Sequence, residues 1–134
     1  MATLTETQRA FVRDNPYFAV LTTIRPDGSP QSTVVWVDEE DGELVFNTAR
    51  GRAKERYLSA NPKAAVTVIN PEDGYEWLAV SGTVTLESEG ANEMINRLSR
   101  KYDGKDYPAE RFERETRVTG RLRPGLIYSR GLDG

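Results

Sequence analysis

The segment from Thr48 to Arg56 concentrates the residues of this chain that could bind an anion. It reads Thr-Ala-Arg-Gly-Arg-Ala-Lys-Glu-Arg, with four basic side chains and one carboxylate, within a protein of formal net charge -3. The segment follows a predicted strand and opens a predicted helix, where free backbone N–H groups carry partial positive charge and favour anions. Gly51 allows the backbone a close approach to a ligand, and the Thr48 hydroxyl can donate a hydrogen bond.

Arg50, Arg52 and Lys54 are the cations that we expect at this anion site. A helix beginning near Arg52 would place Arg52 and Arg56 on one face, with Lys54 beside them. The alternative is a solvated basic helix, but only Glu55 is available locally to balance the four cations. The sequence therefore favours binding of a phosphate or carboxylate group.

The chain contains no histidine and no cysteine among its 134 residues. This composition excludes a Ser-His-Asp triad, a thiol nucleophile, an imidazole metal ligand and a zinc–thiolate site. The acidic run from Asp38 to Asp41 lacks the ligand spacing of a calcium-binding loop, so we expect a solvated hairpin tip there and no metal site. If the protein is an enzyme, its reactive chemistry then belongs to a bound cofactor, and the sequence assigns no catalytic residue.

The negative net charge argues against a general nucleic-acid or membrane-surface binder. No stretch approaches the length of about 18 apolar residues that a membrane-spanning helix needs. Residues 1–6 lack the basic and apolar regions of a signal peptide. We expect a cytoplasmic protein that acts on a small molecule, with neither nucleic acid nor membrane as a partner.

Turn residues and apolar patterns predict six strands and three or four helices in a single domain, residues 1–134. The expected strands are 17–25, 30–37, 43–48, 64–69, 75–86 and 116–128, and the expected helical segments are one capped by Thr5 that stops by Asn15, then 53–60, 90–102 and 108–114. Tight turns join the first three strands, which is typical of an antiparallel meander. Gly82 suggests a bulge within its strand. This order predicts a mainly β or α+β fold, an antiparallel barrel or sandwich with peripheral helices.

Aromatic and basic residues outside the cationic segment offer further candidates. Tyr75 directly follows a turn and could form a pocket wall. Trp36 lies on a predicted strand, where a core or interface role is the more common one. The arginines Arg117, Arg121 and Arg123 alternate along the last strand, so they project from one side together. They could pair with acids or reach a partner's cofactor.

Four segments of the sequence together carry a resemblance to a known family. They are Ala19–Gln31, Leu44–Thr48 followed by Arg52-Ala53-Lys54 and Leu58, Asn61–Val66, and Asp73-Gly74-Tyr75 leading to Val80–Val84. In this order and spacing they resemble the pyridoxamine 5′-phosphate oxidase-like superfamily, the split β-barrel flavin and deazaflavin oxidoreductases. The resemblance covers nearly the whole chain and implies a six-stranded antiparallel split β-barrel with peripheral helices.

The same resemblance implies an obligate homodimer with two cofactor sites at its interface. It implies that the cofactor phosphate sits on the segment holding Thr48, Arg50, Arg52 and Lys54. The residues implied for the ring lie on two neighbouring strands and are Gln31, Thr33, Val35, Phe46 and Asn47.

The choice of cofactor lies between coenzyme F420, a 5-deazaflavin, and FMN. Residues 76–82 occupy the strand where the phosphate-substrate oxidases carry an Arg-rich motif, and this strand has no arginine. The short chain, the Arg-Ala-Lys spacing and the Asp-Gly-aromatic turn look closest to the actinobacterial branch that uses coenzyme F420, whose phosphodiester tail is extended by glutamates. We therefore expect an F420-dependent oxidoreductase that transfers hydride between the deazaflavin and a small organic acceptor, with solvent or a tyrosine as proton donor. An FMN-binding reductase or oxidase and a non-catalytic protein that binds or sequesters a cofactor are the alternatives.

Overall fold

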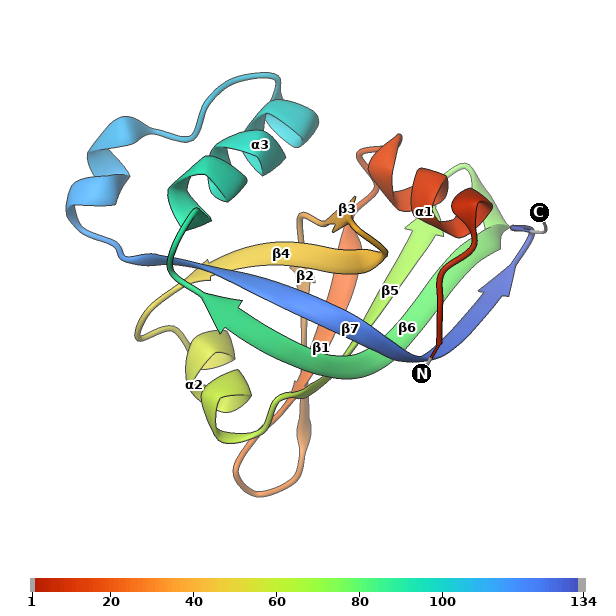
Figure 1. Cartoon of the computed structure of the whole chain (residues 1–134), viewed down its shortest axis with the longest axis horizontal. Coiled ribbons are helices and arrows are strands. Elements are labelled where there is room, and N and C mark those ends of the chain that lie inside the picture. Colours follow the sequence, from red (N-terminus) through yellow and green to blue (C-terminus); the bar gives the residue numbers. More distant parts are fainter. Residues whose placement is uncertain (1, 133–134) are drawn as a thin grey trace.

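A seven-stranded antiparallel sheet with three α-helices and one 3-10 helix forms the protein in this computed structural model, which describes residues 2–132 (Figure 1). The strands are β1 (Ala19–Ile24), β2 (Pro30–Val35), β3 (Asp38–Glu40), β4 (Glu43–Ala49), β5 (Lys63–Asn70), β6 (Asp73–Glu87) and β7 (Arg117–Arg130). The helices are α1 (Glu6–Arg13), α2 (Ala53–Ala60), α3 (Ala91–Asp103) and the 3-10 helix η1 (Ala109–Glu113). Of these helices, none within residues 2–132 is both long and apolar enough to cross a membrane.

The strand order is β2-β1-β5-β6-β7-β4-β3, and every neighbouring pair is antiparallel. The predicted antiparallel, helix-decorated sheet is confirmed. The predicted count of six strands is wrong, because Asp38–Glu40 forms the additional strand β3, and the two edge strands β2 and β3 do not close the sheet. The predicted three-strand meander is also wrong, since β2 pairs with β1 alone and the β3–β4 hairpin joins the opposite edge through β7.

The physical reason for both differences lies in the acidic segment Asp38–Asp41, which we expected to be a solvated hairpin tip. Asp38 and Glu39 are only 4% and 3% exposed. The Arg9 Nε donates to Glu39 at 2.8 Å, and Arg97 Nε lies 3.0 Å from the Asp38 carboxylate. These partners come from α1 and α3, far away in the sequence. Buried carboxylates need such partners, so the chain crosses to the other edge of the sheet, where they are available.

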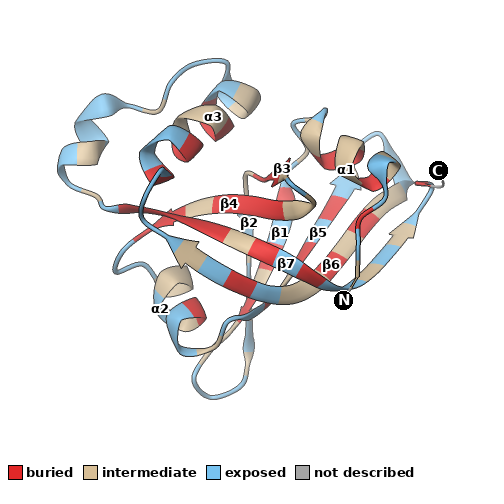
Figure 2. Ribbon diagram, in the orientation of Figure 1, coloured by how far each residue is buried: buried red, intermediate tan, exposed pale blue. Residues whose placement is uncertain are grey.

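The core lies between the curled sheet and the helices that cover it. Figure 2 shows buried residues along the middle of the sheet and on the sides of α1 and α3 that face it. The predicted capping box at the start of α1 is confirmed: the Thr5 hydroxyl accepts from Gln8 N, and the Gln8 side chain accepts from Thr5 N. The predicted core residues of α3, Met94, Ile95 and Leu98, are buried, so this helix is fixed against β4 and β7.

Two glycines show where strands approach one another closely. The bulge predicted at Gly82 is confirmed by a register shift between Ser81 and Gly82 in the β6–β7 ladder, and an added Cβ at Gly82 would overlap the Arg123 carbonyl. At Gly120, an added Cβ would overlap the ring of Phe46. Phe46 therefore fills the space that Gly120 leaves in the core.

Candidate functional site

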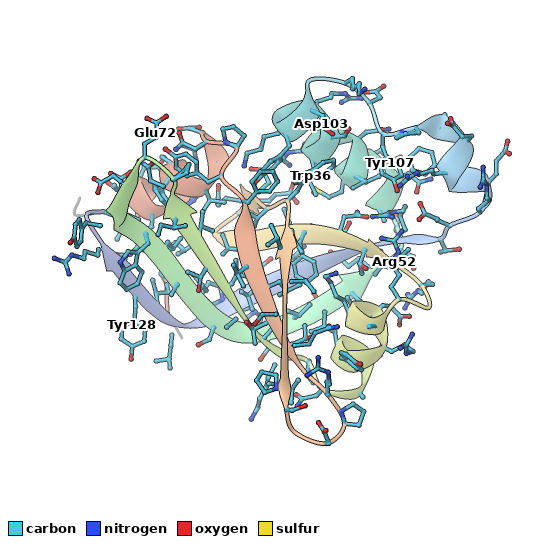
Figure 3. All side chains as sticks on the ribbon, turned by 180° about the vertical axis from the view of Figure 1, so that it is seen from behind. Trp36, Arg52, Glu72, Asp103, Tyr107 and Tyr128 are labelled. Carbon is cyan, nitrogen blue, oxygen red and sulfur yellow. The ribbon has the colours of Figure 1, made fainter. Side chains whose placement is uncertain are left out.

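A cavity of about 280 Å³ opens beside the end of β4, beneath α3 and η1. Its walls come from β2, β4, α2, α3, η1 and the start of β7. Figure 3 shows Trp36, Tyr107 and Arg52 around this region, whereas Tyr128 lies at the other end of the molecule. The lining residues are Phe18, Val34, Val35, Trp36, Asn47, Thr48, Arg52, Lys54, Ile95, Leu98, Tyr107, Arg111 and Arg117.

One end of the cavity is cationic, and its most buried charge belongs to Arg117. The Arg117 side chain is 3% exposed. Its Nε donates to Asn47 Oδ1 at 2.8 Å, and one terminal nitrogen lies 3.3 Å from both the Tyr107 hydroxyl and a Glu115 oxygen. Burial lowers the pKa of Arg117 below its usual value. Asn47 is oriented in turn by its amide nitrogen, which donates to the Ala91 carbonyl at 2.9 Å.

Thr48 brings an unsatisfied hydroxyl to the same end. Thr48 is 2% exposed, and its Oγ1 has no hydrogen-bond partner among residues 2–132. A buried hydroxyl without a partner costs stability, so such a group in a cavity indicates a ligand or water that completes its hydrogen bonding. The structure thus places an unused donor beside the cationic residues.

Lys54, like Arg111, lines the cavity without an ion pair to a carboxylate in the described part of the chain. It lies in the first turn of α2 and is half-buried. Burial lowers the pKa of Lys54, and the positive charge of Arg52 lowers it further. An anion in the cavity would reverse both effects, because it would offset the lost hydration and the repulsion.

The repulsion expected within the cationic segment is relieved by carboxylates of the folded chain. Arg50 pairs with Glu55 at 3.3 Å and also donates to Ser88, and it does not line the cavity. Arg52 pairs with Glu115, which lies 63 positions further along the chain. The Gly51 N–H, expected to be free for an anion, donates to Glu55 at 2.9 Å. The anion-binding capacity thus rests more on the side chains than on the start of α2.

The other end of the cavity is apolar and aromatic. Phe18 and Val34 remain 60% and 66% exposed, and Trp36 packs against Met94 and Leu98 of α3. The Trp36 ring stacks on Tyr102, with centroids 5.6 Å apart and planes 13° from parallel. A flat apolar group could pack here while an attached anion reaches Lys54.

Five of the ten residues predicted for the site line this cavity, and five do not. Those that line it are Val35, Asn47, Thr48, Arg52 and Lys54. Those that do not are Gln31, Thr33, Phe46, Arg50 and Tyr75.

Arg50 is held outside the cavity by Glu55, and the other four outlying residues lie in three different places. Phe46 is fully buried against Gly120 in the core. Tyr75 is 70% exposed and packs beside Gly131, beyond the far end of β7 from Arg117. Gln31 and Thr33 share a face of β2 with Val35, and both hold buried oxygens without hydrogen-bond partners among residues 2–132.

Sequence reasoning missed Phe18, Tyr107 and Arg111 as cavity residues and left the role of Arg117 open. Two guanidinium groups lie over the Tyr107 ring, with the Arg111 and Arg117 Cζ atoms 5.5 and 5.1 Å from its centroid. The alternation of arginines in β7 was the available signal in the sequence. In the structure these arginines have different surroundings: Arg117 lines the cavity, whereas Arg121 pairs with Glu40 and Glu87.

The comparisons with known proteins agree with this fold. Residues 4–129 match the family described as "Pyridoxamine 5'-phosphate oxidase". The chain belongs to this family. A solved structure named "F420 Reductase" is 30% identical, with 93% of this chain and 98% of that chain covered and a TM-score of 0.79. No curated protein sequence matches the chain.

More distant solved structures share the fold. A conserved hypothetical protein of Mycobacterium tuberculosis is 22% identical, covers 95% of this chain and 84% of its own, and has a TM-score of 0.74. A putative pyridoxamine 5′-phosphate oxidase of Listeria innocua is 21% identical, with 90% and 92% covered and a TM-score of 0.68. The family match and the F420 reductase place the chain among flavin- or deazaflavin-binding proteins of oxidoreductase type with a split-barrel fold.

Glu115 should compete with an incoming anion, because it already holds Arg52 and Arg117. We expect Glu115→Gln to tighten the binding of inorganic pyrophosphate about fivefold, the effect of about 1 kcal/mol at a partly exposed ion pair. Isothermal titration calorimetry would measure the change.

Glu113→Gln is the matched control, since it removes the same charge from an exposed position of η1. If both variants tightened binding equally, the effect would come from net charge, and a specific role of Glu115 would be contradicted.

Proposed function

We propose that this protein is an oxidoreductase that uses coenzyme F420 to transfer hydride between the deazaflavin and a small organic acceptor. The observation that carries the proposal is one cavity with two unlike ends, a cationic end holding the unpartnered Thr48 hydroxyl and an aromatic end at Trp36. A phosphate-bearing ring compound has the same two parts. The 30% identity to a protein named F420 reductase supports the deazaflavin in particular.

The residues of the cavity fit such a cofactor. Its phosphate would be held by Thr48, Lys54 and Arg52. The buried Arg117 would add positive charge at the same end of the cavity. The ring would pack against Val35 and the aromatic wall. The unpartnered buried oxygens of Gln31 and Thr33 lie on the same face of β2 as Val35, which lines the cavity.

The protein's part in the reaction is positioning and exclusion of water. When bound, the reduced deazaflavin supplies the hydride for an electron-poor carbon. Trp36, Ile95 and Leu98 provide apolar surface that keeps water from the reacting groups, and the cations fix the anionic end so that the ring is held in one place. Tyr107 brings a hydroxyl to the cavity, but this hydroxyl is hydrogen-bonded to Glu115 at 2.9 Å, so the proposal assigns no proton donor.

One observation favours coenzyme F420 over FMN, and one favours FMN. A recess of about 310 Å³ adjoins the cavity and is lined by Arg52, Arg111, Arg114 and Glu115, which suits the glutamate-extended tail. In contrast, Arg50 and Arg52 are already paired with carboxylates, which leaves fewer free cations for a long tail. FMN is therefore the second candidate cofactor.

Titration with each cofactor, followed by Trp fluorescence, tests the proposal. We expect coenzyme F420 to bind more tightly than FMN, and Lys54→Met to weaken both about tenfold or more, since a charge-assisted hydrogen bond contributes about 1.5–3 kcal/mol. Oxidation of the reduced cofactor when quinones, enones or nitro compounds are added would distinguish an enzyme from a protein that only binds the cofactor.

Lys105→Met is the control for Lys54→Met, since Lys105 is exposed and does not line the cavity. Tight binding of FMN with no binding of the deazaflavin would contradict the assigned cofactor. Equal affinity of Lys54→Met and the wild type would contradict the assigned site.

We also propose that the active form is a homodimer. The strand register aligns Val34, Val20, Thr67, Ala79 and Tyr128 in one row across five strands. Three of these side chains, Val34, Val20 and Tyr128, are exposed apolar or aromatic groups. Val34 also lines the cavity, so a second copy packed on this row would border the cofactor site.

Val20→Glu should disrupt the homodimer, because it places a charge in the middle of the row. We expect the variant to elute as a monomer in size-exclusion chromatography with light scattering and to lose most of its cofactor affinity. Thr3→Glu adds the same charge at an exposed position outside the row. A wild-type protein that is monomeric at micromolar concentration would contradict the proposal.

A further inference from the structure

Tyr102 packs behind the aromatic wall of the cavity without lining the cavity itself. Its ring stacks on Trp36 at 5.6 Å and lies 5.5 Å from the Phe18 ring at an angle of 42°. Trp36 and Phe18 come from different segments of the chain, and both line the cavity. One side chain of α3 therefore contacts both aromatic residues of the wall.

The hydroxyl of Tyr102 holds the backbone next to each of these residues. It accepts a hydrogen bond from Val37 N at 3.1 Å, and the carbonyls of Tyr17 and Val37 are the acceptors available for its proton. Val37 directly follows Trp36, and Tyr17 directly precedes Phe18. The same side chain thus fixes the two wall residues by ring contact and by their neighbouring peptide groups.

The surroundings keep this arrangement intact. Burial raises the pKa of Tyr102 to about 12, so the hydroxyl keeps its proton at neutral pH. The adjacent Lys101 Nζ donates to the Val37 carbonyl at 2.8 Å and to the Val12 carbonyl at 2.6 Å, which holds the same β2–β3 crossover from α3. The crossover that carries Trp36 is therefore tied to α3 at two consecutive positions.

We propose that Tyr102 is the positioning residue of the ligand ring: it orients Trp36 and Phe18 so that a flat ring can pack against them. The proposal rests on the proposed function, in which this wall receives the cofactor ring. Phe18 is largely exposed, and its ring contacts that of Tyr102. A site whose supporting residues are loose loses affinity, because the ligand must then order them on binding.

The variant Tyr102→Phe keeps the ring but removes both backbone contacts. Tyr17→Phe is the matched control, since the Tyr17 hydroxyl makes no hydrogen bond within residues 2–132. In the ligand-free protein, Trp36 and Trp77 give two indole N–H signals by NMR. We expect Tyr102→Phe to shift or broaden the Trp36 signal and to leave Trp77 unchanged, and we expect Tyr17→Phe to alter neither.

Binding is measured with two probes that report on opposite ends of the cavity. We expect Tyr102→Phe to weaken riboflavin, which has a ring but no phosphate, about threefold to tenfold, the range for one or two lost hydrogen bonds. We expect inorganic pyrophosphate to bind the variant as it binds the wild type. A second readout leaves Tyr102 unsubstituted. In wild-type protein labelled with 3-fluorotyrosine, we expect the fluorine NMR signal of Tyr102 to shift when riboflavin binds.

The proposal is overturned if the Trp36 signal is unchanged in Tyr102→Phe, or if riboflavin and pyrophosphate weaken in parallel, which would indicate general destabilisation. An unshifted Tyr102 fluorine signal in the riboflavin complex would overturn it as well. The indole measurement needs no ligand, so failure of the proposed cofactor site would be recognised separately, as absence of flavin and deazaflavin binding to the wild type.

Discussion

The buried guanidinium of Arg117 is the constraint on which the cavity depends. A charge this far from water must be surrounded by hydrogen-bond acceptors, and removing one partner of such a group is costly. Its acceptors are Asn47 of β4, and Tyr107 and Glu115 of the segment before β7. Three parts of the chain therefore meet at one point. Their meeting forms the cationic end of the cavity, which Thr48 and Lys54 also line.

Helix α3 connects the cationic end of the cavity to the aromatic wall at the other end. Asn96 accepts a hydrogen bond from Tyr107 N at 2.9 Å, and Tyr102, six residues later, contacts Trp36 and Phe18. The helix is itself fixed by Leu98 and Met94 against Val45. A rigid element that touches both ends keeps their separation constant. This is what a ligand with an anionic group and a ring at a fixed spacing requires.

The parts of the fold that depend on local interactions could be predicted from the sequence. The bounds of α2 and the capping box of α1 each follow from residues within a few positions of one another, and the bulge at Gly82 was predicted from the glycine itself. The presence of Thr48 and Lys54 at one cavity could be predicted for the same reason, and their binding of an anion stays a prediction. Strand β3 could not, because its buried Asp38 depends on Arg97 of α3. The site residues Tyr107 and Arg117 were missed or left open because their partners are brought near only by the folded chain.

The central claim is that one ligand spans the cavity from Lys54 to Trp36. Amide and indole chemical-shift mapping of the labelled protein, titrated with coenzyme F420, tests it most directly. We expect shifts at Thr48, Lys54 and the Trp36 indole, with none at Tyr75 beyond the far end of β7. Shifts confined to the Tyr75 end, or to Lys54 without Trp36, would contradict it.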